Sequence, residues 1–141
     1  MKQTPKGWPR LTSALFYEDA GAAIAWICRA FELQIRLKID GENGVIVHSE
    51  LEYGDALLMV SSVSKNKRHA SPRALGGLNT QQIMLFVDDV DAHCAHAREM
   101  GATIIVEPHT EDYGEDYWSD RSYQAEDLEG HLWWFCQRMR G

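Results

Sequence analysis

His48 and Glu50 are the two side chains of this sequence best placed to do chemistry together. They lie two residues apart in the segment 45–52, and in a strand this spacing places both on one face. Such a pair can act in acid–base catalysis, with Glu50 removing a proton from a substrate carbon and His48 donating one. The same two side chains can also ligate a divalent metal, or form a hydrogen-bonded polar patch without a chemical role.

Two further histidines lie in a segment predicted to be a helix, residues 90–100. His93 and His96 are three residues apart, a spacing that can bind a metal. The apolar face of this helix runs through Val90, Cys94 and Ala97, so both histidines are expected to face solvent. The three cysteines of the chain are odd in number and widely spaced, which argues against a disulfide framework.

The segment 108–120 is rich in acidic and aromatic residues and is predicted to be a long surface loop. Its carboxylates lack the spacing of a calcium-binding loop. The hairpin predicted over residues 121–136 is closed by a turn at 127–130, because Asp127 suits the start of a type I turn and Gly130 accepts a positive φ angle. His131 follows this turn and is expected to mark the hairpin rather than bind a ligand.

Composition indicates a compact unit of one domain. At 141 residues, with 45% hydrophobic residues, the chain can bury a sizeable core. The formal net charge of −7 disfavours nucleic acid and anionic membranes as partners, because both bind basic surfaces. No apolar run approaches the roughly 20 residues of a bilayer span, and the first ten residues lack the apolar segment of a signal peptide. A cytoplasmic location is therefore expected.

The first half of the chain predicts a strand, a helix and three more strands. Apolar periodicity and turn residues place these elements over residues 11–17, 20–31, 33–39, 45–52 and 56–61. Asp19 is a natural N-cap for the helix. The polar segment 62–79 is rich in glycine and basic residues and is predicted to be a surface linker.

The same order of elements then repeats. The sequence FYEDA at 16–20 lies 70 positions before FVDDV at 86–90, and Gly54 lies 76 positions before Gly130. Two copies of a strand–helix–three-strand module, residues 11–61 and 80–138, explain this correspondence within a single domain of residues 1–141. The expected fold class is α+β, with two βαβββ modules forming an eight-stranded curved sheet around a groove.

These motifs resemble the vicinal oxygen chelate superfamily, which includes glyoxalase I, extradiol dioxygenases and bleomycin-resistance proteins. The resemblance extends from about residue 11 to residue 135 and is carried by YEDA at 17–20, HSELEYGD at 48–55, FVDDVDAHCAHAREMGA at 86–102 and DLEGHLW at 127–133. Two departures are Leu128, where the family usually has proline, and the lengthened segment 113–121. The sequence is most similar to glyoxalase-like proteins of unassigned activity.

The resemblance implies four positions that hold the metal in metal-using members, and here they match Thr12, Glu50, Gln82 and Trp134. Only Glu50 is a good ligand for a divalent ion, and tryptophan cannot ligate at all. We therefore expect no metal site and no cofactor, with a divalent metal at Glu50 as the alternative. The enzyme hypothesis that remains is a lyase, isomerase or dioxygenase-type reaction that uses Glu50 and His48.

The resemblance also implies which side chains line the groove. The expected lining is mostly apolar with a few polar groups, as in pockets for small organic molecules. It includes Thr12, Phe16, Gln82, Met84 and Trp134, unless these residues only pack a core. Beside the groove, Trp118, Arg121 and Tyr123 are expected to form a lid or a contact between chains. The predicted function is binding of a small molecule by a homodimer.

Overall fold

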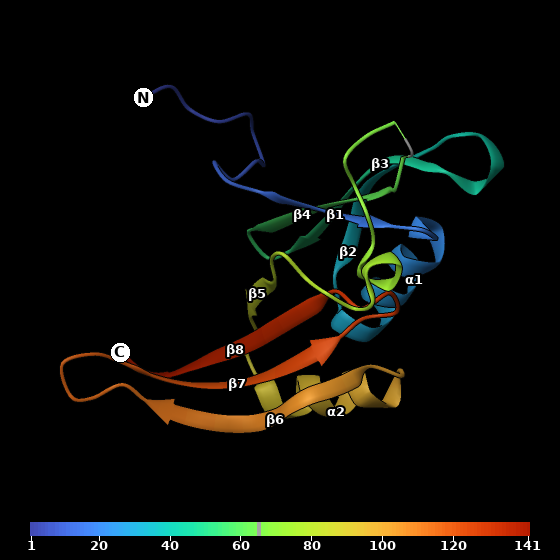
Figure 1. Cartoon of the computed structure of the whole chain (residues 1–141). Helices are drawn as coiled ribbons and strands as arrows, with labels where there is room; N and C mark the ends of the chain where they lie inside the picture. The colour runs from blue at the N-terminus through green and yellow to red at the C-terminus, as the bar shows by residue number, and fades with distance from the viewer. Residues whose placement is uncertain (65) are drawn as a thin grey trace.

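Two modules follow each other along the chain, as Figure 1 shows for the computed structural model, which describes residues 1–64 and 66–141. Residue 65, in the predicted linker, lies outside the described residues. The first module contains β1 (Ser13–Tyr17), α1 (Ala20–Phe31), β2 (Gln34–Asp40), β3 (Ile46–Tyr53) and β4 (Ala56–Ser62). The second contains β5 (Ile83–Phe86), α2 (Val90–Glu99), β6 (Thr103–Asp112), β7 (Ser119–Glu126) and β8 (Leu132–Arg140). Short 3₁₀ turns, Glu42–Gly44 and Pro72–Leu75, lie in the connections.

Each module forms its own four-stranded sheet. The strand orders are β1-β4-β3-β2 and β5-β8-β7-β6, and in each sheet the first strand is parallel to its neighbour while the other pairs are antiparallel. Within the described residues no strand of one sheet pairs with a strand of the other, so the eight strands are divided between two open sheets. The repeated module and the predicted fold class are confirmed.

Helix α1 forms where the sequence predicts it. The side chain of Asp19 accepts a hydrogen bond from the backbone N–H of Ala22 at 3.0 Å and caps the first turn. Ala20, Ile24 and Ile27 share the face that packs into the core, and each is at most 1% exposed. Burial of this apolar face stabilises the helix more than intrinsic propensity does.

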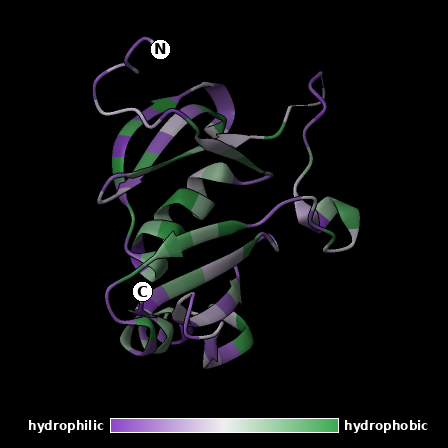
Figure 2. Ribbon diagram, turned by 90° about the vertical axis from the view of Figure 1, so that its left-hand side faces the viewer, coloured by the Kyte–Doolittle hydropathy of each residue, from purple (hydrophilic) through white to green (hydrophobic). Residues whose placement is uncertain are grey.

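A single hydrophobic core spans both modules. Figure 1 shows α1 between the two sheets, and the ring of its last residue, Phe31, lies 5.0 Å from the ring of Trp133 and 4.7 Å from that of Phe135. Hydrophobic residues extend along the strands of both sheets and along the helix between them (Figure 2). The indole N–H of Trp26 in α1 also donates to the carbonyl of Met100, 2.9 Å away, at the end of α2. The two modules are therefore packed as one unit.

The prediction of a long loop over residues 108–120 is wrong. Strand β6 continues to Asp112 and β7 begins at Ser119, so only residues 113–118 connect them. An acidic composition alone indicated a solvated loop. In the fold, however, Asp112 forms an ion pair of 2.7 Å with Arg140 of β8. A basic residue from outside the segment 108–120 therefore compensates part of its acidic charge.

Within the described residues no helix combines the length and the apolar character needed to cross a membrane.

Candidate functional site

A cavity of about 470 Å³ lies between the two sheets and is called the inter-sheet cavity below. On one side its walls come from β1, the β3–β4 hairpin and Leu33, which follows α1. On the other side they come from β5 and the start of β8. The lining residues are Pro9, Leu11, Thr12, Ser13, Leu33, Leu51, Tyr53, Ala56, Leu57, Leu58, Gln81, Gln82, Ile83, Met84, Leu85 and Trp133.

Polar residues are a minority of the cavity lining, and the hydrogen bonds of one of them, Gln81, are long. The side-chain amide of Gln81 donates to Ser13 Oγ at 3.3 Å and to the carbonyl of Ala14 at 3.5 Å, both long for such bonds. The Oε1 atom of Gln82 accepts from the amide of Gln124 at 3.1 Å. Among the described residues, neither the amide nitrogen of Gln82 nor the Oε1 atom of Gln81 has a hydrogen-bond partner. Both atoms therefore remain available to a ligand.

Three of the predicted groove residues line the inter-sheet cavity: Thr12, Gln82 and Met84. Phe16 lies elsewhere, with its ring stacked on that of His69 at 3.5 Å between centroids. Trp134 is half-buried on β8, opposite Met84 in the strand register, but it does not reach the cavity. Of the five residues predicted to line the groove, the structure thus places three at the inter-sheet cavity.

The three residues predicted to form a lid or a contact between chains also lie apart from the cavity. Trp118 is 40% exposed, and the guanidinium of Arg138 lies over its ring at 5.2 Å. Arg121 forms an ion pair of 2.8 Å with Asp91 of α2, on the outside of the second module. Tyr123 is fully buried in the core. None of these three side chains lines the inter-sheet cavity.

His48 and Glu50 do lie together, as predicted. The Nε2 atom of His48 is 3.1 Å from Glu50 Oε1, and the Nε atom of Arg36 donates to Glu50 Oε2 at 2.7 Å. The hydrogen bond from His48 and the ion pair with Arg36 hold the pKa of Glu50 below its ordinary value, against the effect of burial. A carboxylate with a lowered pKa is a weak base at neutral pH, so this arrangement favours the polar patch over the acid–base pair.

The four positions that correspond to metal ligands do not form a metal-binding set. Thr12 donates its hydroxyl proton to the carbonyl of Leu57, and Glu50 is held by Arg36, away from the cavity that contains Gln82. The fourth position is an indole, which offers no ligand atom. Among the described residues, no cluster of three or more His, Cys, Asp or Glu side chains is arranged to hold a metal ion. Absence of a cofactor stays a prediction.

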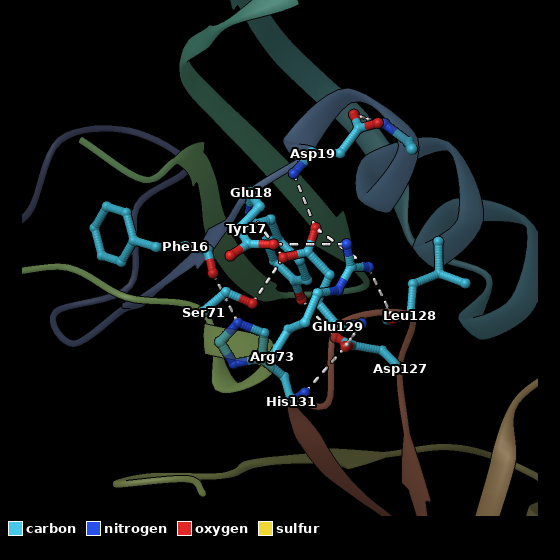
Figure 3. Close-up of polar contacts among 11 residues, drawn as sticks. Phe16, Tyr17, Glu18, Asp19, Ser71, Arg73, Asp127, Leu128, Glu129 and His131 are labelled. Carbon is cyan, nitrogen blue, oxygen red and sulfur yellow. Dashed lines mark hydrogen bonds and ion pairs between the residues drawn. The ribbon is translucent and has the colours of Figure 1, made fainter. Parts of the chain in front are cut away.

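The turn at 127–130 has a role that the sequence did not reveal. Figure 3 shows its carboxylates pointing into the junction between the modules. Glu129 accepts hydrogen bonds from the backbone N–H groups of Glu18 and Asp19, at 2.7 and 2.9 Å, and from the hydroxyl of Ser71, at 2.7 Å. The second module therefore holds the start of α1 in the first module, where the helix dipole also favours a negative charge.

Asp127 completes this junction. Its carboxylate accepts from the hydroxyl of Tyr17 at 2.6 Å and from the indole N–H of Trp133 at 3.0 Å. Burial and the nearby Asp127 charge raise the pKa of Tyr17 well above its ordinary value, so the phenol stays protonated and donates. His131 donates from Nε2 to the carbonyl of Phe16 at 2.9 Å, which fits its predicted structural role.

The prediction that His93 faces solvent is wrong, because this side chain is only 4% exposed. Its Nδ1 lies 2.7 Å from the hydroxyl of Tyr123, and its Nε2 lies 3.3 Å from the carbonyl of Phe31. These partners fit a neutral imidazole that donates from Nε2 and accepts at Nδ1. Helix periodicity considers only the second module, in which this side of α2 has no partner. In the fold, α1 of the first module packs against it.

Burial lowers the pKa of His93 below the ordinary value of 6.5, which predicts a pH-dependent stability. The unfolded chain protonates this histidine more readily than the folded chain does. The free energy of unfolding should therefore fall as the pH decreases through about 6.5, until the folded-state pKa is reached. Urea unfolding at pH 5.5 to 8 measures this decline, which His93→Gln should make shallower. His109→Gln, at a side chain that is 43% exposed, is the control. Equal pH profiles for all three proteins would contradict the prediction.

A sequence model of the Glyoxalase/Bleomycin resistance protein/Dioxygenase superfamily matches residues 11–135, which is most of the chain. The chain belongs to this superfamily. Two curated relatives are uncharacterized proteins of Mycobacterium bovis and Mycobacterium tuberculosis strain H37Rv, each 30% identical over 135 residues. The match covers 94% of this chain in both, and 85% and 76% of the relatives, respectively.

Solved structures share the superfamily fold. TioX from Micromonospora sp. ML1 superposes with a TM-score of 0.69 at 29% identity, covering 92% of this chain and 95% of TioX. A lactoylglutathione lyase from Agrobacterium tumefaciens superposes with a TM-score of 0.63 at 18% identity, covering 96% of both chains. The second similarity shows the fold alone. The superfamily that the sequence motifs predicted is confirmed by the family match over residues 11–135.

Proposed function

We propose that this protein binds a small organic molecule in the inter-sheet cavity. The observation that supports this proposal is the cavity itself: about 470 Å³, lined mainly by apolar side chains of two sheets and by a few polar ones. Ligand sites in proteins typically have roughly 300–1,000 Å³ and this same make-up. A molecule of drug-like size would fit, and its apolar surface would leave water on binding.

The position of the cavity supports a binding role as well. Buried core residues support its walls, since Leu51 and Trp133 are at most 1% exposed, so the site is largely formed before a ligand arrives. A preformed site loses little free energy to ordering on binding. The weakly bonded Gln81 amide, by contrast, can change partners at low cost, which allows a ligand to replace its contacts with β1.

A cavity-filling substitution tests this proposal. Ala56 lines the cavity and Ala25 lies exposed on α1, so Ala56→Phe and Ala25→Phe form a matched pair. A fragment library of aromatic compounds is screened by ligand-observed NMR. Compounds that bind the unaltered protein should lose at least about tenfold in affinity with Ala56→Phe, because the new ring occupies their space, and should bind Ala25→Phe normally. Hits that Ala56→Phe leaves unaffected would contradict the proposal.

A homodimer is the second part of this proposal. Each sheet turns one face away from the helices, and these faces expose apolar side chains: Leu37 at 40%, Ile39 at 44% and Phe86 at 47%. Apolar sheet faces of this kind are typically covered by another chain. Sedimentation velocity at micromolar concentration measures the oligomeric state. The absence of nucleic-acid and membrane partners stays a prediction based on the net charge, and the cytoplasmic location stays a prediction based on the lack of a long apolar run.

The enzyme alternative has weaker support. Its residues, His48 and Glu50, form a contact of 3.1 Å, but they do not line the inter-sheet cavity, and Arg36 binds the same carboxylate. Mass spectrometry of each bound compound after incubation tests for turnover. Conversion that disappears in Glu50→Gln would favour the enzyme, whereas binding without conversion favours the proposed function.

A further inference from the structure

The walls of the inter-sheet cavity carry no formal charge. Among the described residues, those that line it include no Asp, Glu, Lys, Arg or His. A quarter of the chain consists of Asp, Glu, Lys and Arg, so an uncharged wall of this size does not follow from composition. Tyr53 is the one lining residue with a shifted pKa, and burial raises it, so its phenol stays neutral. The cavity therefore has no counterion for a charged guest.

A charged ligand would bind at a disadvantage here. An ion moved from water into an apolar cavity loses its hydration, and only a paired charge or several hydrogen bonds offset that loss. Charged side chains of both signs line an adjoining hollow that shares Pro9 and Ala56 with the cavity: Lys6, Arg10, Arg36, Glu52 and Asp55. None of these charged side chains lines the cavity itself, so neither an anion nor a cation inside it would find a counterion there.

Two of the polar residues that line the cavity, Gln81 and Gln82, carry a side-chain amide. They are consecutive residues just before β5, and each amide has one acceptor oxygen and one donor nitrogen. Gln82 uses its oxygen for Gln124 and keeps its nitrogen free, while Gln81 uses its nitrogen in two long bonds and keeps its oxygen free. Together they offer the cavity one donor and one acceptor from consecutive residues.

We infer that the ligand of the inter-sheet cavity is an uncharged, largely apolar molecule with an amide-like edge, in which a hydrogen-bond donor lies beside an acceptor. This inference rests on the proposed function and specifies its ligand class. The free donor of Gln82 would bind the ligand's carbonyl oxygen, and the free acceptor of Gln81 would bind its N–H. The apolar body of the ligand would lie against Leu58, Leu85 and Trp133.

Four probes of nearly equal size test the ligand class by isothermal titration calorimetry: 2-naphthamide, 2-acetylnaphthalene, 2-naphthoate and 2-naphthylmethylammonium. The neutral amide should bind at least about tenfold more tightly than either ion, because neither ion finds a counterion in the cavity. The neutral ketone, which accepts but does not donate, should bind about fivefold more weakly than the amide, as expected for one hydrogen bond of about 1 kcal/mol.

Substitution at the two glutamines locates the contact. Gln82 is exposed enough to be replaced without loss of folding, and Gln82→Met should lower the affinity for 2-naphthamide about fivefold. Gln81→Met should lower it by the same factor but change the affinity for 2-acetylnaphthalene by less than about twofold. If an ion binds as tightly as the amide and Ala56→Phe abolishes that binding, the cavity function stands and the ligand class is wrong. If Ala56→Phe changes the binding of none of the four probes, the function and the ligand class fail together.

Discussion

Glu129→Ala is expected to lower the free energy of unfolding by about 3 kcal/mol, an effect large enough to remove much of the stability of a domain of this size. The side chain of Glu129 is 1% exposed, yet it is surrounded by donors. Two backbone N–H groups of the β1–α1 connection and the hydroxyl of Ser71 all donate to its two oxygens. Alanine would leave these three donors without a partner at the point where the modules meet.

Two substitutions at the same turn separate this effect from a general loss of structure. Glu129→Gln keeps the shape and one acceptor but directs an NH₂ group at donors, so it should cost less than alanine and still more than about 1 kcal/mol. Leu128→Ala changes the exposed neighbour, at 45% exposure, and should stay within about 0.5 kcal/mol. Urea unfolding followed by circular dichroism measures all three. A Glu129→Ala protein as stable as Leu128→Ala would show that the junction contributes little.

Phe31→Ala is expected to lower the free energy of unfolding by about 3–5 kcal/mol, the usual range for removing a buried aromatic ring. Phe31 is fully buried and ends α1, but its ring lies among rings of the second module. Trp26 of its own helix approaches it edge-on at 4.9 Å. Truncation would create a cavity between the modules, and neighbouring rings fixed in two sheets could close it only in part.

The control for this substitution is Phe86→Ala, which removes the same side chain from a position that is 47% exposed. It should cost about 1 kcal/mol or less, since nearly half of that side chain already contacts solvent. Urea unfolding gives both values, and tertiary-structure signals from the second module should be lost in the same transition as those from the first. Separate transitions in Phe31→Ala would indicate that the modules fold independently. A small cost would contradict the view of Phe31 as a shared core residue.

Much of the fold follows from local patterns that the sequence states directly. The 70-residue repeat around Asp19 and Asp89 predicts two equivalent helix starts, and both aspartates cap their helices as expected, through Ala22 and Ala92. Alternation along residues 45–52 placed His48 and Glu50 on one face, and the structure confirms their contact. Such features depend on φ and ψ preferences and on side-chain period, which neighbouring residues determine.

The candidate site was only partly predictable. Thr12, Gln82 and Met84 were assigned to a groove, and they do line a cavity. Phe16 and Trp134 were assigned to the same groove, but the structure places them elsewhere, because the strands form two separate sheets and not one curved sheet. The family pattern indicates which face of a strand a residue occupies, and the relative placement of the two sheets decides which faces meet.

By itself the sequence determined the two modules, the helix caps, the closing turn and the superfamily. The tertiary structure alone decided that Glu129 holds a helix start 110 residues earlier, that Arg36 binds Glu50, and that α1 buries His93. The reason is physical: these contacts join segments far apart in the chain, so their formation depends on how the modules pack. Local preferences act before that packing, while burial, pKa shifts and cavities exist only after it.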